Sequence, residues 1–282
     1  MFLGEMGPVK KETVVKNHNS PPVVIQHNNL IQNTSNNLTL RQSKILLFLI
    51  SCISKNDQNM PNILIDYTTL LEITGERKSM HSKKRIEDFL KDLSGKVFYE
   101  FEGEMIKAFP WFMQVYINYN GKNMVLFTFN PILKDHLLQL KRNFTQYKLG
   151  YILDLSSTYS IKLYDIFSSY SFIGSMDISV DELRSLLNLK NEHEDIDKFP
   201  VYKELNRRVL SPCIADINAK TDLTIKYDPI GCLDDRRKVC RILFHIEKKE
   251  DVSPAHIIPE YFIEKNAAYS KLIGEVRKIK LT

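Results

Sequence analysis

Cysteine and long apolar runs are scarce in this chain of 282 residues. It contains four cysteines: Cys52, Cys213, Cys232 and Cys240. They form no C-x-x-C pair and have no histidine at zinc-site spacing, so we interpret them as reduced thiols. The longest unbroken apolar run, Ile45 to Ile50, is far shorter than the roughly 18–20 residues of a membrane span, and the first residues lack the apolar stretch of a secretion signal. The sequence therefore predicts a cytoplasmic protein without a membrane segment.

Motifs that carry enzymatic chemistry are also absent from the sequence. There is no G-x-x-x-x-G-K-[ST] phosphate loop and no G-x-G-x-x-G, G-x-S-x-G or H-E-x-x-H motif, and the ten glycines leave little loop for cradling phosphates. The seven histidines are isolated, which argues against a metal-dependent nicking enzyme of the rolling-circle type. No acid, base and nucleophile group together. We therefore expect a protein that is not an enzyme and that binds no cofactor and no metal.

Charge and length leave a binding function open. Lys+Arg (39) exceed Asp+Glu (34) by five, a mild excess that permits an anionic partner without demanding one. At about 100–200 residues per domain, the chain is long enough for one large domain or two ordinary ones. With 43% hydrophobic residues it can bury a core.

Periodicity divides the first half of the chain into elements. Residues 1–22 lack periodicity, which predicts a flexible segment, and a short extended piece follows over 23–25. Apolar residues at spacings of three and four over 45–53 then predict a buried helix that Thr39 caps.

Further short elements follow that helix. A strand over 63–65 leads into a short helix, with Asp66 or Thr68 as its cap and Gly75 as its end, and an amphipathic helix follows over 79–93. After it the period falls to two, and we expect the following elements: strand 97–101, turn 102–104, strand 111–119, a tight turn at Asn120-Gly121, strand 125–129 and a linker helix over 131–141.

The same order of elements recurs downstream. One set of apolar positions matches a second set at a constant offset of 113 residues: Ile65, Tyr67, Leu70 and Ile73 match Ile178, Val180, Leu183 and Leu186. In the second copy the surrounding helices and strands are expected over 161–172, 201–219, 223–227 and 239–246. Helix, strand, helix, helix and hairpin is the order of a winged helix-turn-helix. The predicted fold class is therefore α+β, with two tandem winged helix-turn-helix domains related by internal duplication.

This duplication predicts four parts of the chain. They are a flexible N-terminal segment (1–22), an N-terminal winged-helix domain with the linker helix (23–141), a C-terminal winged-helix DNA-binding domain (142–250) and a basic C-terminal tail (251–282). The tail is either a short surface helix or a loose segment that adds non-specific affinity.

Basic residues gather on the elements that a winged helix-turn-helix places against DNA. The second helix of the motif enters the major groove with its N-terminal residues, where side chains read base edges or bind phosphate. In the first copy the candidate DNA-binding residues are Arg77, Lys78, Ser79, His81, Lys83 and Lys84. In the second copy they are Lys198, Lys203, Asn206 and Arg207 on the helix, and Arg236, Arg237, Lys238 and Arg241 on the hairpin.

Side-chain direction refines this interpretation of the second copy. With Tyr202, Leu205 and Val209 buried, we expect Lys203, Asn206 and Arg207 to share the outward face and Arg208 to lie nearer the buried side. Pro212 removes a backbone donor and is expected to bend the helix between a DNA-facing half and a half packed on the core. Runs of basic residues are more often only solvated surface. The assignment of these residues to DNA binding therefore depends on their position on these elements.

Two segments of the second copy form specific motifs. One is Tyr159-Ser160-Ile161-Lys162-Leu163-Tyr164-Asp165-Ile166, and the other is Arg208-Val209-Leu210-Ser211-Pro212-Cys213-Ile214-Ala215-Asp216-Ile217-Asn218 followed by Thr221-Asp222-Leu223. Asn29-Leu30-Ile31 and Leu38-Thr39-Leu40 with Gln42 add to them. Together these segments resemble the iteron-binding plasmid replication initiators over roughly residues 23–248, with Cys213 and Asp216 in place of that family's usual Ala and Glu.

The resemblance implies a function and partners. It implies a protein that binds direct repeats (iterons) in duplex DNA at a plasmid origin, helps open adjacent A+T-rich DNA without hydrolysing nucleotide, and recruits the host initiator and helicase. It also implies a homodimer, in equilibrium with monomer, that represses its own promoter.

The residues themselves leave two other functions open. One is a winged-helix transcription regulator with no role in replication, which the same fold would serve. The other is a protein-interaction module in which the apolar hairpin face around Trp111 and Phe112 forms a dimer surface and the basic residues are incidental.

Overall fold

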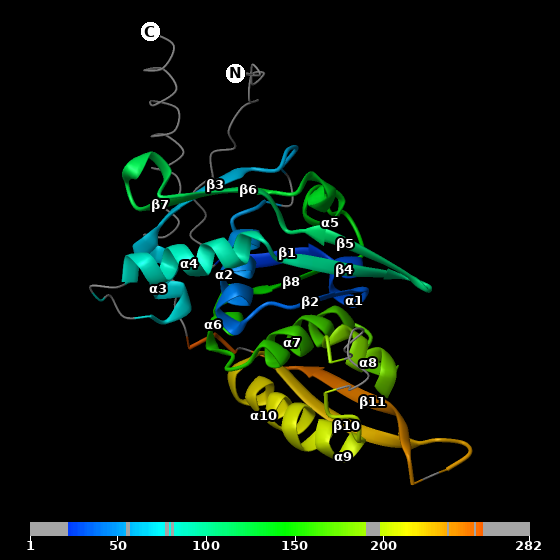
Figure 1. The fold of residues 1–282 in the computed structure, drawn as a ribbon. Coiled ribbons are helices and arrows are strands. Elements are labelled where there is room, and N and C mark those ends of the chain that lie inside the picture. Colours follow the sequence, from blue (N-terminus) through cyan, green and yellow to red (C-terminus); the bar gives the residue numbers. More distant parts are fainter. Residues whose placement is uncertain are drawn as a thin grey trace.

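The computed structural model describes residues 22–54, 57–76, 79, 82–189, 198–235, 237–250 and 252–255. These residues form two winged-helix units, one above the other in Figure 1, with helix α7 (Thr158–Tyr170) between them. The predicted α+β class with two tandem winged-helix domains is confirmed. Within this described part of the chain, no helix combines the length and the apolar character needed to cross a membrane.

The first half of the chain folds around helix α2. Its elements are β1 (Val23–His27), α1 (Asn28–Gln32), β2 (Thr34–Asn36), α2 (Leu40–Ser51), β3 (Asn62–Asp66), α3 (Tyr67–Thr74), α4 (Ser82–Ser94), β4 (Val97–Glu102), β5 (Met105–Pro110), β6 (Phe112–Ile117) and β7 (Met124–Phe129). We call α2, α3, α4 and the hairpin β4–β5 the N-terminal unit. The apolar side of α2 is buried in the core, as its spacing predicts.

The predicted helix ends in this unit are confirmed. Thr39 Oγ1 accepts a hydrogen bond from the backbone N–H of Gln42 at 3.4 Å, and Gln42 Oε1 accepts one from that of Thr39 at 2.9 Å, which is a capping box. Asp66 Oδ1 accepts from the N–H of Thr69 at 2.9 Å and starts α3. Gly75 ends α3 with a φ of +71°, a conformation that glycine adopts at no steric cost.

The strands of this half form two three-stranded sheets, ordered β2-β4-β5 and β3-β7-β6. The hairpin β4–β5 is the wing, and its strand β5 was not predicted. The reason is that Met105 and Ile106 are apolar and exposed, so the hydrophobic pattern does not alternate with burial. The tight turn predicted at Asn120-Gly121 is also wrong, because Asn118, Asn120 and Asn123 all adopt positive φ and spread the turn over a longer loop.

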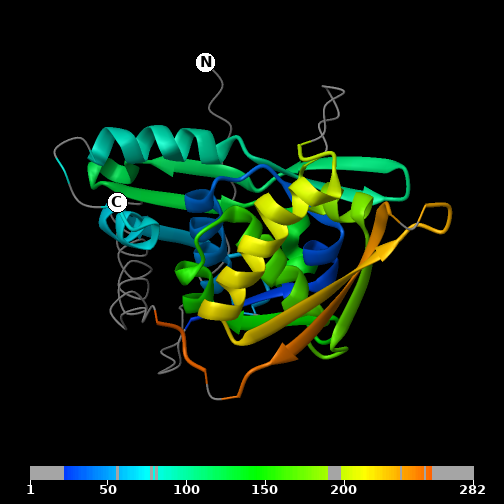
Figure 2. The same cartoon turned by 90° about the horizontal axis from the view of Figure 1, so that it is seen from below.

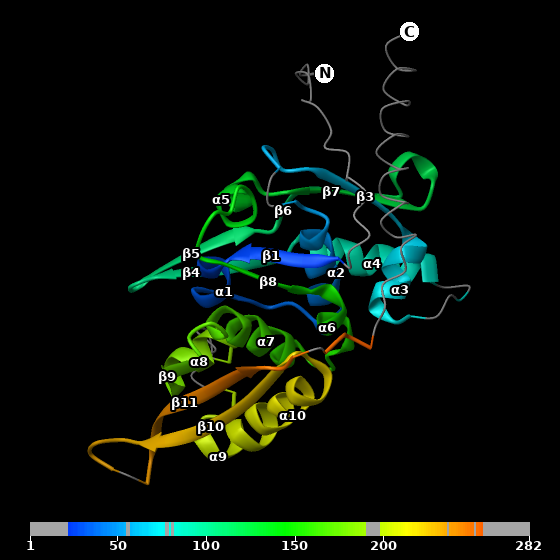
Figure 3. The same ribbon diagram turned by 180° about the vertical axis from the view of Figure 1, so that it is seen from behind.

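The segment after β7 is less helical than predicted. It forms the short turn η2 (Pro131–Leu133), α5 (Lys134–Leu137), β8 (Phe144–Lys148) and α6 (Leu149–Asp154). The helix predicted over 131–141 is wrong beyond Leu137, since Leu138 is extended (φ −115°, ψ 152°). Strand β8 pairs antiparallel with β1, beside which it lies in Figure 3. Where the chain divides between its domains stays a prediction.

The second copy arranges its described strands in a single sheet. Its elements are α7, β9 (Ser175–Ser179), α8 (Val180–Leu186), α9 (Tyr202–Leu205), the π-helical turn η3 (Asn206–Leu210), α10 (Ser211–Lys220), β10 (Leu223–Gly231) and β11 (Val239–Lys248), which we call the C-terminal unit. One sheet, ordered β10-β11-β9, contains all its strands among the described residues. The internal match is confirmed: Ile178, Val180 and Leu183 are buried, and each stands at the same place in its unit as a buried residue of the first copy.

A buried polar network joins α7 to the first half of the chain. Lys162 Nζ donates to the carbonyl oxygens of Ile31 at 2.7 Å and Thr34 at 2.8 Å. Asp165 Oδ1 accepts from the hydroxyl of Tyr147 and, at 3.4 Å, from Gln26 Nε2. Burial lowers the pKa of Lys162 to about 8 and raises the pKa of Asp165 to about 6. The first sequence motif therefore holds the two halves together.

The second motif holds the C-terminal unit itself together. Asn218 Oδ1 accepts from the N–H of Ile225 at 2.7 Å, and Asn218 Nδ2 donates to the Ile225 carbonyl at 3.0 Å, which ties α10 to β10. The Tyr164 hydroxyl donates to Asp222 Oδ1 at 2.7 Å and ties α7 to the start of the wing. The hydrogen bonds of Asn218, Tyr164 and Asp222 therefore explain why these residue types stand at these positions.

Two of the cysteines are paired. Cys232 and Cys240 form a disulfide, so their interpretation as reduced thiols is wrong. The antiparallel hairpin β10–β11 brings their Cα atoms to 5.2 Å, inside the roughly 4.4–6.8 Å of ordinary disulfides. Their spacing matches no cysteine motif, and only the register of the hairpin brings them together. Cys213 is a buried thiol.

Candidate nucleic-acid interface

A buried arginine fixes the start of the second helix in the C-terminal helix-turn-helix. Arg184, on α8, donates from Nη2 to the carbonyl oxygens of Phe199, at 2.9 Å, and of Pro200. Its Nη1 lies 3.6 Å from Asp181 Oδ1. Because this side chain binds the backbone directly before α9, it sets the position of that helix relative to α8. Arg184 was not among the predicted residues, and no sequence motif marks it.

A π-helical turn stands where a bend was predicted. The N–H of Ser211 donates to the carbonyl of Asn206, five residues back, in place of the α-helical bond. Pro212 follows directly and has no N–H to donate to the carbonyl of Arg208, so the wider turn accommodates the missing bond. The helix therefore continues through η3 into α10, with Cys213, Ile214 and Ile217 buried on the core.

The π-helical turn presents two arginines. Arg207 and Arg208 are exposed by 61% and 55% of their side-chain surface, so the expectation that Arg208 lies nearer the buried side is wrong. Arg207 Nη2 and Arg208 Nε both lie 2.8 Å from Glu204 Oε2. These hydrogen bonds lower the pKa of Glu204 to about 2, so its carboxylate stays charged. The guanidinium of Arg208 also lies over the Phe199 ring, 5.9 Å from its centre.

The remaining predicted residues of this helix differ in exposure. Lys198 and Lys203 are exposed, as expected for phosphate contacts. Asn206 is half-buried, and its Oδ1 accepts from the Tyr227 hydroxyl at 2.6 Å. The amide oxygen of Asn206 is therefore engaged by the wing strand β10, and its NH₂ group is the part left to donate to a base.

The wing β10–β11 carries three of the predicted cations in the described residues. Arg237 is almost fully exposed and lies 3.4 Å from Asp235 Oδ1. Lys238 is exposed. Arg241 is partly exposed and forms a 3.0 Å ion pair with Asp177 on β9. Arg236 lies outside the described residues.

The start of α4 forms the corresponding surface of the N-terminal unit. Lys83 and Lys84 are exposed. Ser79 Oγ accepts from Arg85 Nη2 at 3.0 Å, and Arg85 also lies 4.0 Å from Glu76, which pairs with Arg41. The predicted residues Arg77, Lys78 and His81 lie outside the described residues.

Both wings point the same way. In Figures 1 and 2 the hairpins β4–β5 and β10–β11 project toward the same side of the molecule. A single protein surface thus carries two hairpins, which suits contact with one extended partner such as duplex DNA.

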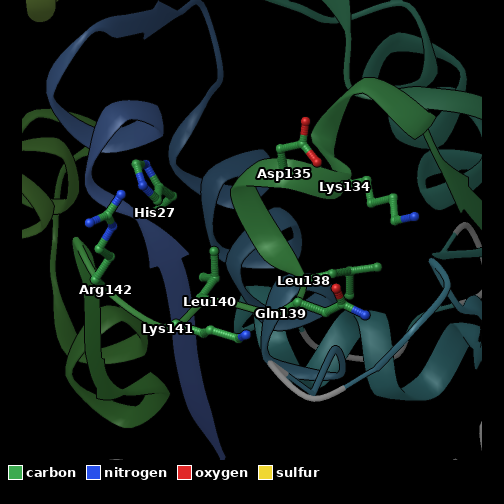
Figure 4. A pocket seen from close by; sticks show the side chains of 8 residues that line it. All are labelled: His27, Lys134, Asp135, Leu138, Gln139, Leu140, Lys141 and Arg142. Atoms are coloured by element: carbon green, nitrogen blue, oxygen red, sulfur yellow. The ribbon is translucent and has the colours of Figure 1, made fainter.

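Other candidate sites are weaker. Trp111 and Phe112 are 3% and 4% exposed, so these two side chains belong to the core and are not themselves available to the dimer surface considered around them. A pocket of about 320 Å³ lies between His27 and the loop after α5. Figure 4 shows that its cations do not converge, since Lys134 points away from Arg142. Across the described ranges, no group of three His, Cys, Asp or Glu side chains could hold a metal ion.

Comparison with known proteins agrees with this geometry. Residues 23–168 match the family described as "Initiator Replication protein, WH1", and residues 179–246 match "Initiator Rep protein, WH2". A curated "Replication initiation protein" of Escherichia coli is 24% identical over 154 residues, which is 52% of this chain and 45% of that protein. The chain thus matches less than half the length of that relative.

A solved structure supports the fold. The crystal structure of the Pi initiator protein in complex with iteron DNA superimposes with a TM-score of 0.66 at 18% sequence identity, covering 83% of this chain and 100% of that chain. The two family matches take in most of the described residues: the first runs from β1 into α7, and the second from the end of β9 into β11. The chain therefore belongs to the family of replication initiator proteins that combine the winged-helix domains WH1 and WH2.

Proposed function

We propose that the protein initiates replication of a plasmid by binding direct repeats, or iterons, in the duplex DNA of its origin. The observation that carries this proposal is the pair of winged-helix units, each with exposed cations on its second helix, with both wings on one side. The family membership and the iteron DNA bound to the Pi initiator protein support it. The role is one of binding, without catalysis.

Two kinds of contact with DNA are assigned in this proposal. Arg207 and Arg208 suit bidentate contacts to guanine, because their guanidinium groups are already held in place by Glu204. The exposed lysines suit phosphate: Lys83, Lys84, Lys198, Lys203 and Lys238. The other residues proposed to bind DNA are Arg77, Lys78, Ser79, His81, Asn206, Arg236, Arg237 and Arg241.

The proposal extends to steps around DNA binding. The protein helps open adjacent A+T-rich DNA and recruits the host initiator and helicase, and as a dimer it represses its own promoter. Met105 and Ile106 on β5 and Met113 on β6 are apolar and exposed, which suits them to a dimer contact.

Selection from a random duplex pool tests the binding. The full chain at about 0.15 M salt is expected to enrich one sequence family with a dissociation constant of about 10⁻⁸ M or below, at least a thousandfold tighter than for random duplex. Absence of any enriched sequence would contradict the proposal. A plasmid that carries only this gene and the repeats beside it then separates replication from regulation, since a transcription regulator would bind those repeats and leave the plasmid unable to replicate.

A further inference from the structure

We propose that the Cys232–Cys240 disulfide is a thiol–disulfide exchange site, and that its reduction by a low-molecular-weight thiol weakens the binding of DNA. The site lies at the base of the wing tip, the segment 233–239 that the two cysteines enclose. This inference rests on the proposed function, because it assigns a control to the same DNA-binding wing.

The disulfide stands where the regular hairpin ends. Strands β10 and β11 pair from Leu223↔Lys248 to Gly231↔Val239, with an irregularity directly before that last pair. Beyond it, the N–H of Cys232 donates to the carbonyl of Lys238 at 2.8 Å. The covalent bond therefore fastens the tip at its base, while the ladder below it is held by its own backbone pairing.

The tip residues that the structure describes, 233–235 and 237–239, include highly exposed side chains. Leu233 is fully exposed and Arg237 is 95% exposed on its side chain. The N–H of Lys238 donates to the Asp235 carbonyl at 3.0 Å, which is a bond within the tip. Without the disulfide the tip would sample more conformations, and DNA binding would have to order them again.

The wing tip and the two residues after it are basic in sequence. Residues 233–241 carry four Lys/Arg and two Asp. Arg237 and Lys238 stand between the two cysteines, and Arg241 follows Cys240 directly. These cations attract anionic thiols and stabilise thiolates, so exchange at this site is favoured by its own surroundings. The same cations are proposed to bind phosphate, so thiol–disulfide exchange and DNA binding would take place in one segment.

Burial sets the order of the exchange. Cys232 is 6% exposed and Cys240 is half-buried, so an incoming thiolate reaches Cys240 Sγ first. The disulfide breaks, Cys232 leaves as a thiolate, and a mixed disulfide forms on Cys240. A second thiolate attacks that mixed disulfide on the incoming sulfur, releasing Cys240 and a low-molecular-weight disulfide. The two thiol protons end on the cysteines, and the reverse reaction uses the low-molecular-weight disulfide as oxidant.

Linkage gives the inference a second, independent readout. If the oxidised protein binds DNA more tightly by some factor, then bound DNA must shift the thiol–disulfide equilibrium toward the disulfide by the same factor. One measurement follows DNA affinity and the other follows cysteine oxidation, so agreement between the two factors excludes irreversible loss of active protein as the cause of weaker binding.

The experiment uses the full chain and two probes, a duplex enriched from the random pool and a random-sequence duplex at low salt. Affinity is measured for oxidised protein and for protein reduced with dithiothreitol, and reduction is expected to weaken binding about tenfold. The double variant Cys232→Ser/Cys240→Ser should bind like reduced protein with or without dithiothreitol. The control Cys213→Ala keeps the wing pair and should lose affinity on reduction as the parent does.

Cysteine oxidation is then measured by alkylation and mass spectrometry of Cys232 and Cys240 in glutathione buffers, with and without the enriched duplex. A shift of the midpoint ratio by the same factor as the affinity supports the inference. DNA binding that changes less than twofold on reduction, or that still responds to dithiothreitol in the double variant, overturns it and leaves the proposed function standing. If neither form binds any duplex, both proposals fail together.

Discussion

The two winged-helix units present their cations in different ways. In the N-terminal unit, α4 is an uninterrupted helix whose first turns carry the exposed Lys83 and Lys84. In the C-terminal unit, the corresponding helix is widened at η3, and Glu204 holds Arg207 and Arg208 with hydrogen bonds of 2.8 Å each. Lys83 and Lys84 thus present ammonium groups at the start of α4, whereas Arg207 and Arg208 present guanidinium groups that a carboxylate orients.

This difference indicates a division of work. Lysine ammonium groups are compact charges on flexible stems, which suits phosphate, whereas a guanidinium fork must be oriented to meet a base edge with two hydrogen bonds. Holding Arg207 and Arg208 in place before binding lowers the cost of ordering them on DNA. We therefore expect the C-terminal unit to read sequence and the N-terminal unit to add affinity that does not depend on sequence.

The sheets of the two units differ as well. The strand before α8, β9, pairs with the wing strand β11, so the helix-turn-helix and the wing share one sheet. The strand before α3, β3, pairs instead with β7, and the wing β4–β5 pairs with β2. In the C-terminal unit the helix-turn-helix is therefore joined to the wing by strand pairing, which suits accurate placement on a base sequence.

The largest predicted effect concerns the network that joins the halves. The pKa of Asp165 is raised to about 6 by burial, above its ordinary value of 3.8, so the folded state holds the proton more tightly. Stability is then fully present below pH ~4 and is lost as pH rises through about 6, by about 3 kcal/mol. We expect urea unfolding between pH 4 and 7 to show this loss in the parent.

The matched variant is Asp165→Asn, which keeps the size of the side chain and removes its titration. Its unfolding free energy should fall less than that of the parent over the same pH range. A parent curve that rises from pH 4 to 7 would contradict the assignment, because the carboxyl group would then be stabilised in its charged form.

The next effect concerns sequence reading by the C-terminal unit. Arg207→Ala is expected to weaken binding to the enriched duplex by about 1–3 kcal/mol and to relax base preference at one position. Lys238→Ala should instead weaken all duplexes alike and reduce the slope of affinity against salt by about 1. Competition with duplexes mutated one base at a time separates the two results. If Arg207→Ala leaves base preference unchanged, this arginine does not read sequence.

A third prediction addresses the N-terminal unit. The double variant Lys83→Ala/Lys84→Ala is expected to weaken the enriched and the random duplex by the same factor and to lower the salt slope by about 2. Lys91→Ala, an exposed lysine in the last turn of the same helix that pairs with Asp88 at 3.3 Å, serves as the control and should change neither quantity. Salt titrations with the two duplexes measure both. A loss confined to the enriched duplex would reverse the proposed division of work.

Much of this fold could be predicted because local signals and the repeat agreed. Two helices begin at the caps Thr39 and Asp66, and one ends at Gly75. Each of these signals depends only on residues nearby in the sequence. The match of Ile65 with Ile178 at a fixed offset then assembled such elements into two copies of one unit, as the structure shows. Signals of this kind can be recognised in a sequence because each depends on few residues.

The errors share a different origin. Strand β5 and the pairing of Cys232 with Cys240 depend on hairpin register, which a spacing along the chain does not specify. The exposure of Arg208 depends on the π-helical turn in which it lies, because the wider turn changes the direction in which side chains leave the helix. Arg184 binds backbone carbonyls that lie more than ten residues away, so no local pattern marks it.

The smallest predicted effect tests the carboxylate that orients the arginines. Glu204→Gln removes a negative charge from the helix that we propose to face DNA, so affinity for random duplex should rise about two- to threefold. Affinity for the enriched duplex should rise less, because Arg207 and Arg208 are no longer held in place before binding, and exposed ion pairs of this kind have small effects. Glu247→Gln removes an equal charge on β11 from an exposed position and serves as the control. If Glu204→Gln raises both affinities by the same factor as that control, Glu204 contributes only its charge and the two units present their cations in the same way.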